Sequence, residues 1–80
     1  MRARVFVTLK PGVLDPQGKA VEHGLQSLGY EEVVGVRVGK VFEVELADGV
    51  EDAEARLQRI SDQLLANMVI EDFRVEIEGH

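Results

Sequence analysis

Cysteine is absent from this chain of 80 residues, and prolines number only two. Without cysteine there is no disulfide framework, no thiolate metal site and no thiol nucleophile. The sequence also has no apolar run of the roughly 18 residues that a membrane-spanning helix needs. Its N-terminal residues pass directly into a strand-like pattern and lack the apolar core and cleavage site of a signal peptide. We therefore expect a cytoplasmic protein that does not contact a membrane.

Positive charge is scarce as well, because nine Lys and Arg stand against fifteen Asp and Glu, a formal net charge of −6. Neutralised phosphates supply most of the affinity of proteins for nucleic acids, so this balance argues against a nucleic-acid partner. The length predicts one domain, residues 1–80. A chain this short buries only roughly 60% of its unfolded surface, so its core is small and oligomerisation is an expected supplement.

Both prolines lie in one stretch, Leu9–Gly18, which is the most distinctive run in the chain. Lys10 precedes a proline and is therefore biased toward an extended conformation at the end of a strand. The Pro-Gly pair that follows predicts a turn in which Gly12 takes a positive φ. Asp15 is expected to cap a helix that begins at Pro16. The stretch predicts a strand-to-helix connection, and a ligand-binding loop is the alternative.

Apolar periodicity predicts four strands and two helices. The expected strands are 2–10, 33–40, 41–47 and 69–78, and the expected helices are 16–28 and 51–66. This order predicts an α+β two-layer sandwich of ferredoxin-like βαββαβ topology, with an antiparallel four-stranded sheet and both helices on one face. We expect the crossovers to place the first and third strands side by side and parallel in the middle of that sheet.

Glycine and asparagine mark the expected joints between these elements. The two middle strands are expected to meet in a tight hairpin at Val38–Val41, with Gly39 supplying a positive φ. Gly29 is placed to end the first helix in a left-handed conformation, and Asn67 to end the second. Gly24 lies in the apolar stripe of the first helix, where it would permit close approach of the sheet or of a neighbouring subunit.

The second helix carries a narrow apolar stripe with core spacing: Val50, Ala53, Leu57, Ile60 and Leu64. Leu65 falls off this stripe and is expected to face a partner. Asp52 and Arg56 are expected to form an i,i+4 ion pair worth roughly 0.3 kcal/mol.

Charged residues alternate with apolar ones along the strands. Two arginines of the first strand are expected between glutamates of both neighbouring strands: Arg2 and Arg4 between Glu43, Glu45, Glu76 and Glu78. The simplest interpretation is a solvated face stabilised by cross-strand pairs. The alternative is that Arg4, Phe6 and the edge strands build a subunit interface, because a small sheet with a bare face and free edges invites pairing.

No group of residues has the spacing of a catalytic, metal or cofactor site. His23 and His80 have no spaced partner, and Ser27 and Ser61 have no base nearby in the pattern. The best anion site is the N-terminus of the first helix, where Asp15 opposes an anion. An acylphosphatase-like enzyme would need an arginine after the first strand, and an RNA-recognition module would need more aromatic residues on the central strands.

The run Leu9–Ala20 closely resembles the signature of the PurS family, the small subunits of phosphoribosylformylglycinamidine synthase. The likeness continues through residues 24–25, 28–29, 36–40, 64–67 and 69–71, so it covers essentially the whole chain. The first run is highly specific and the later ones are moderately so. Met68 is a departure, since the family often has proline there, and it bears on how the second helix ends.

The resemblance implies a role in purine biosynthesis that the residue pattern alone does not show. The family's enzyme makes formylglycinamidine ribonucleotide from formylglycinamide ribonucleotide, ATP and glutamine. A synthetase subunit holds the ATP chemistry, with ATP and Mg expected there, and a glutaminase subunit releases ammonia. The small subunit is implied to be a dimeric or tetrameric adaptor that bridges these two and assists ammonia transfer, without catalytic residues or a cofactor of its own.

The candidate interface residues are Arg4, Phe6, Lys10, Asp15, Gln17, Arg37, Lys40, Leu65 and Asn67. The sequence does not assign each of them to a particular partner. A self-assembling small-molecule sensor of ferredoxin-like topology is the alternative function.

Overall fold

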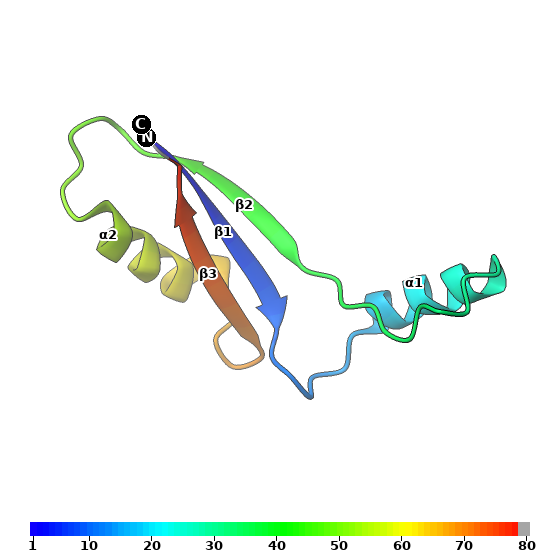
Figure 1. Cartoon of the computed structure of the whole chain (residues 1–80). Coiled ribbons are helices and arrows are strands. Elements are labelled where there is room, and N and C mark those ends of the chain that lie inside the picture. Colours follow the sequence, from blue (N-terminus) through cyan, green and yellow to red (C-terminus); the bar gives the residue numbers. More distant parts are fainter. Residues whose placement is uncertain (79–80) are drawn as a thin grey trace.

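The computed structural model describes residues 1–78. Its elements follow one another as strand β1 (Arg2–Leu9), helix α1 (Pro16–Ser27), strand β2 (Lys40–Glu45), helix α2 (Ala53–Ile60), π-helix η1 (Ser61–Leu65) and strand β3 (Glu71–Ile77). The sheet and α2 form one body, and α1 projects from its lower end (Figure 1). The protein is therefore of the α+β class, as the sequence predicts.

The sheet has three strands in the order β2-β1-β3, and both pairings are antiparallel. On the central strand, Val5 lies opposite Phe42 on one side and Val75 on the other. The expected parallel pairing of the first strand with strand 41–47 is wrong. A crossover makes the second strand parallel to the first, and the reversal after it brings the third strand back antiparallel.

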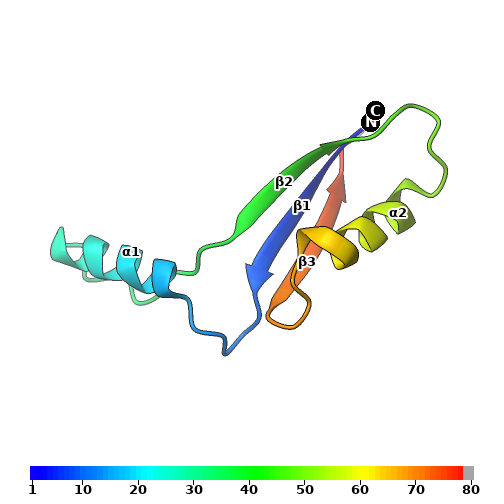
Figure 2. The ribbon, with the colours of Figure 1, turned by 180° about the vertical axis from the view of Figure 1, so that it is seen from behind.

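The core lies on one face of β1, where the period-two alternation predicts it. Ala3, Val5 and Val7 are at most 1% exposed, and α2 covers this face with its fully buried Leu57 (Figure 2). The core is small: Ala66 belongs to the same cluster as Val5 and Val7, and the other side chains packed against them are only partly buried. Burial within this single chain is therefore modest.

The second helix differs from its expected form at both ends. It begins at Ala53, after Asp52 with a left-handed φ of 51°, and no ion pair joins Asp52 to Arg56 within residues 1–78. At its other end the backbone becomes a π-helix, in which the N–H of Ala66 donates to the carbonyl of Ser61 at 2.9 Å. The five-residue spacing of that bond adds a residue to the turn and rotates the side chains that follow.

This rotation exchanges the roles of the two adjacent leucines. Leu64, expected in the core stripe, is 82% exposed, whereas Leu65, expected to face a partner, packs against the core cluster. Asn67 does not take the expected left-handed conformation, because Asp52 is the only non-glycine residue with a positive φ among those described. Asn67 instead organises the following turn, in which its backbone carbonyl accepts from the N–H of Glu71 at 2.7 Å.

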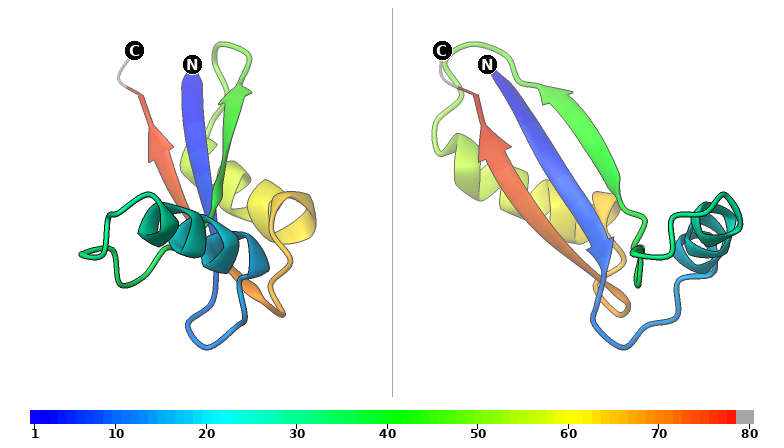
Figure 3. Two further views of the ribbon diagram at one scale, coloured as in Figure 1. Left: turned by 90° about the vertical axis from the view of Figure 1, so that its right-hand side faces the viewer. Right: turned by 45° about the vertical axis from the view of Figure 1, so that its right-hand side comes forward.

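The first helix has its expected bounds but not its expected place. Asp15 caps it, and Gly29 ends it with a φ of 104°. The chain then returns along the helix as a segment without regular secondary structure, residues 33–38, which joins no sheet. We call α1 together with this segment the arm; Figure 3 shows it standing clear of the sheet and of α2. The expected hairpin at Val38–Val41 is wrong, and Gly39 does not have a positive φ.

The arm makes the molecule elongated, with extents of 51 × 28 × 13 Å and a radius of gyration of 16.1 Å. A compact domain of this length has a radius of gyration of about 12 Å. A single copy therefore forms neither the four-stranded sheet nor the pair of helices on one face that the element order predicts.

Candidate interface at the base of the arm

The chain passes the base of the arm twice, outward through residues 10–15 and back through residues 36–39, and the Asp15 carboxylate joins the two passages. Its Oδ1 accepts the N–H of Gly18 at 2.9 Å, and its Oδ2 accepts the N–H of Val38 at 2.7 Å. The residue is 5% exposed. Asp15 thus caps α1 and at the same time holds the returning segment, which is 23 residues further along the chain.

These hydrogen bonds lower the pKa of Asp15 below its ordinary value of 3.8. The N–H of Val38 has the largest effect, followed by that of Gly18, and the Arg37 charge acts in the same direction against the opposing effect of burial. Both bonds favour the ionised carboxylate, which is an acceptor only. Asp15 therefore places its own negative charge at the N-terminus of α1. The sequence had indicated this position as the best candidate for an anion site.

Arg37 closes the turn at the outward passage. Its Nη1 donates to the carbonyl of Val13 at 2.9 Å, and its Nη2 donates to the carbonyl of Lys10 at 3.2 Å. The same turn contains Gly12, whose φ of 88° confirms the positive φ predicted for it. We call Asp15 and Arg37 the clamp, because each links one passage of the chain to the other.

Two glycines allow the backbone to pass closely at this point. A Cβ on Gly18 would lie 2.3 Å from the carbonyl oxygen of Val36, and one on Gly39 would lie 2.8 Å from that of Val7. Both distances are below those of real Cβ contacts, so either side chain would force the backbone apart. Gly18 and Gly39 therefore permit the close passage of backbone segments at the base of the arm. The sequence alone indicated this role for neither of them.

A shallow groove of about 230 Å³ lies where the arm meets the sheet. Its walls are largely apolar, and its polar rim includes Asp15, Gln17, Lys40 and Glu71. The Nζ of Lys40 lies 3.9 Å from Glu71 Oε2. The structure thus brings Asp15, Gln17 and Lys40 together around one groove, with Arg37 beside it in the clamp.

Lys10, Arg4 and Phe6 lie on or beside β1, apart from that groove. The Nζ of Lys10 lies 3.0 Å from Asp72 Oδ1, which ties the end of β1 to β3. The guanidinium of Arg74 stacks over the ring of Phe6 at 4.2 Å on the face that α2 does not cover.

The charges on this uncovered face are paired as the sequence predicts. Arg2 lies 3.3 Å from Glu45 and Arg4 lies 2.9 Å from Glu78. Their side chains are 40–78% exposed, so each pair contributes at most about 1 kcal/mol to stability.

Leu65 and Asn67 lie away from the groove. Leu65 packs inward against the core cluster. The Asn67 side-chain oxygen accepts the N–H of Val69 at 3.1 Å, in the turn that leads to β3. Neither residue contributes to the base of the arm.

Two further kinds of feature, a metal site and a membrane-spanning helix, are absent from the described residues. No three His, Asp or Glu residues of the described part are arranged to hold a metal ion. Nor does any helix within residues 1–78 have the length and apolar character to cross a membrane.

A three-stranded sheet covered by one helix, with a clamped arm projecting from it, defines a small α+β domain whose helix α1 and segment 33–38 stand apart from its core. The family model for PurS, described as phosphoribosylformylglycinamidine (FGAM) synthase, matches residues 2–79. The chain belongs to this family, as its resemblance to the PurS signature predicts.

Individual relatives agree with the family match. The PurS subunit of phosphoribosylformylglycinamidine synthase from Synechocystis is 52% identical over 75 residues, which are 92% of this chain and 75% of that protein. The structure of Bacillus subtilis PurS is 45% identical, covers 98% of both chains and superposes with a TM-score of 0.87. A chain in the structure of PurLQS from Thermotoga maritima is 26% identical, covers 94% of this chain and 93% of its own length, and gives a TM-score of 0.81.

Proposed function

We propose that this chain is the small, non-catalytic subunit of phosphoribosylformylglycinamidine synthase in purine biosynthesis. In this role it bridges the glutaminase and synthetase subunits and assists the transfer of ammonia between them. Membership of the PurS family and the likeness to a chain of PurLQS support the role. ATP and Mg then belong to the synthetase subunit, and the complex works in the cytoplasm.

The observation that carries the proposal is the unpartnered apolar stripe of α1. Val21 is 45% exposed and Leu28 is 75% exposed, and Leu14 just before the helix is 73% exposed. Gly24, in the same stripe, has no other part of residues 1–78 within 4 Å of where its Cβ would lie. An amphipathic helix is normally stabilised by burying its apolar face, so this stripe indicates a contact with another molecule.

A second copy is the first partner we propose for the stripe, in a dimer or a dimer of dimers. The side of the core that α2 leaves least covered lies over β2, since α2 packs mainly against β3. Phe42 and Val44 on that side are only half-buried. The arm of a second copy placed there would add a helix and an extended strand, which completes the four-stranded ferredoxin-like arrangement predicted from the sequence.

The larger subunits are the second kind of partner. The uncovered face of the sheet, with Phe6 stacked under Arg74, and the groove at the base of the arm remain available to them. Of the candidate interface residues, Arg4 and Phe6 belong to the first surface, and Gln17 and Lys40 belong to the second.

Leaving this chain out of a reconstituted enzyme tests the bridging role. With the synthetase and glutaminase subunits alone, we expect glutamine-dependent synthesis to be lost while ammonia-dependent synthesis remains. Retained glutamine-dependent activity would contradict the proposal. A ligand-induced rise in the melting temperature of this chain alone, with no complex formed, would favour the sensor alternative.

Charged substitutions on α1 test the stripe separately. Val21→Glu with Leu28→Glu should abolish self-association, because two carboxylates would be buried against apolar surface. His23→Glu with Ser27→Glu adds the same charge at other exposed positions of α1 and should leave the mass measured by light scattering unchanged. Equal effects of the two double variants would show that net charge, and not the stripe, is responsible.

A further inference from the structure

Two arginines on α2 stand out from every other cationic side chain of the described residues. Six of the nine lysines and arginines lie within 4 Å of a carboxylate, and Arg37 donates to backbone carbonyls. Arg56 and Arg59 are the two that remain, and within residues 1–78 neither has an acidic partner. In a chain of net charge −6, two exposed cations left unpaired on one helix are a distinctive feature.

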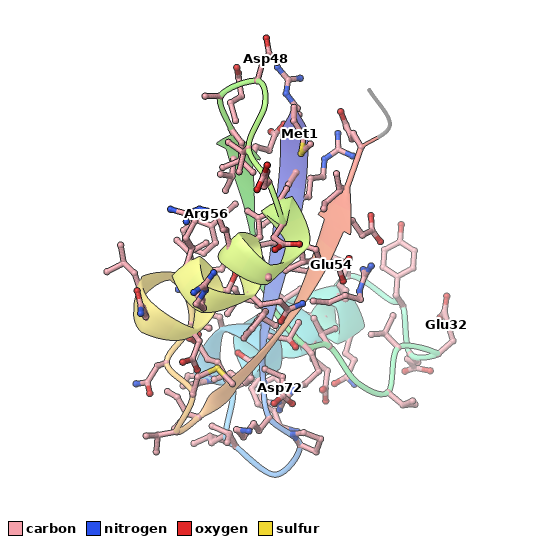
Figure 4. The ribbon with its side chains drawn as sticks, turned by 90° about the vertical axis from the view of Figure 1, so that its left-hand side faces the viewer. Met1, Glu32, Asp48, Glu54, Arg56 and Asp72 are labelled. Atoms are coloured by element: carbon pink, nitrogen blue, oxygen red, sulfur yellow. The ribbon has the colours of Figure 1, made fainter. Side chains whose placement is uncertain are left out.

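The two arginines share one flank of α2. They are three residues apart and therefore neighbours on the helix surface. With Ile60 and Gln63 they line a hollow of about 220 Å³. In Figure 4 Arg56 projects from the side of α2 that lies away from β3, and α2 packs mainly against β3 on its other side. The flank therefore borders the place proposed above for the arm of a second copy.

An unpaired acidic pair stands at the far end of the arm. Glu31 and Glu32 follow the end of α1, are exposed, and take part in none of the ion pairs formed among residues 1–78. In Figure 4 Glu32 and Arg56 point to opposite sides of the molecule. One copy thus carries both halves of a charge-complementary contact that it cannot make with itself.

The lengths of the two helices are compatible with a contact between copies. α1 has 12 residues and is about 18 Å long, and α2 with η1 is about 20 Å long. If α1 of a second copy lay antiparallel beside α2, its last turn would lie beside the turns of α2 that carry Arg56 and Arg59.

We propose that the Arg56–Arg59 flank of α2 receives the arm of a second copy, through ion pairs with Glu31 and Glu32 at the tip of that arm. The contact is self-complementary, so a two-fold dimer makes it twice. It rests on the proposed self-association and adds to it a residue-level account of how the arm is held in register. The pairs lie at the rim of the contact, so they add specificity more than affinity.

Charge reversal on each side, followed by mixing, tests this inference with the full chain. Arg56→Glu/Arg59→Glu and Glu31→Arg/Glu32→Arg should each raise the dimer dissociation constant at least about tenfold at low salt, as measured by analytical ultracentrifugation. An equimolar mixture of the two variants should recover dimers with nearly wild-type affinity, because each hybrid contact pairs opposite charges. Glu43→Arg/Glu54→Arg is the matched control, since it reverses two exposed carboxylates, one on β2 and one on α2, outside the Arg56–Arg59 hollow and should leave association unchanged.

The possible results separate this inference from the proposal beneath it. A wild-type chain that is monomeric would overturn the self-association and this contact together. A wild-type dimer whose mass and affinity are unaffected by either reversal would overturn this contact alone. Normal self-association of the arginine variant, with loss of binding to the larger subunits, would also overturn it, because the flank would then serve another protein.

Discussion

At the scale of single residues, Asp15 carries the connection between the arm and the sheet. Its two carboxylate oxygens accept one N–H from each passage of the chain, at 2.9 and 2.7 Å. An asparagine has only one acceptor oxygen, so it cannot accept both N–H groups, and its own N–H₂ would face one of them. The residue type is therefore dictated by two donors that lie far apart in sequence.

We expect Asp15→Asn to lower the melting temperature by roughly 4–8 °C at neutral pH, because one buried N–H loses its acceptor. The reference is wild type at the same protein concentration, measured by circular dichroism. Arg37→Gln also weakens the clamp, through the turn, and should be less destabilising because Arg37 is exposed. An Asn variant as stable as wild type would show that the clamp contributes little.

The same carboxylate gives a pH dependence of known sign. Because folding lowers the pKa of Asp15, its contribution is complete above the ordinary value of 3.8 and is lost as pH falls through the lowered pKa. The difference in melting temperature between wild type and Asp15→Asn should therefore be constant from pH 7 to about 5 and shrink below about 4. A difference that grew on acidification would contradict this assignment.

The sequence alone predicted one of the two hydrogen bonds of Asp15. Asp15 was predictable as a helix cap because the cap and its Gly18 partner are three residues apart. Its bond to Val38 was not, because no local pattern relates positions 23 residues apart. Gly18 and Gly39 were likewise recognisable only from the backbone that passes beside them.

At the scale of elements, local signals placed β1 and α1 well and misjudged the end of α2. The alternation of β1 and the cap, proline and glycine of α1 each act within a few residues. The π-turn Ser61–Leu65 instead depends on which of two adjacent leucines packs better against the core. Because Leu64 and Leu65 are identical residue types, only α-helical spacing distinguished them, and the π-turn shifts that spacing by one residue.

This pair gives a direct test of the π-helix. Leu65→Ala should destabilise the protein by about 1–3 kcal/mol, because it removes a partly buried side chain from the core cluster. Leu64→Ala should change stability by no more than about 0.5 kcal/mol, since Leu64 is 82% exposed. Urea unfolding of both variants measures the difference. The reverse order would mean that the helix continues in ordinary α geometry.

At the scale of the whole molecule, the fold divides into a sheet body and an arm that shares no core with it. The order of the elements predicted a compact sandwich. The packing rules behind this prediction assume that one chain supplies all of the packed elements. Residues 33–39, expected within a strand, join no sheet in this copy. On our proposal a second molecule completes that part of the fold, and a single sequence carries only indirect information about such a partner.

If copies complete one another, thermal stability must depend on protein concentration. Mass action then predicts that the melting temperature falls on dilution, whereas that of a monomer stays constant. A dilution series over about a hundredfold, followed by scanning fluorimetry, is sufficient to see the trend. A constant melting temperature in a chain whose mass is that of a dimer would require association that survives unfolding.

The two ends of the described chain lie together at the end of the sheet opposite the arm (Figure 1). The carbonyl of Arg2 accepts the N–H of Glu78 at 2.9 Å, so a short linker could join these two parts of the chain without crossing the body. A permuted chain could then begin and end at the tip of the arm, near Gly29, and keep both passages through the clamp. Such a protein would carry its termini at the surface where, on our proposal, two copies meet, so any label placed there would report assembly directly.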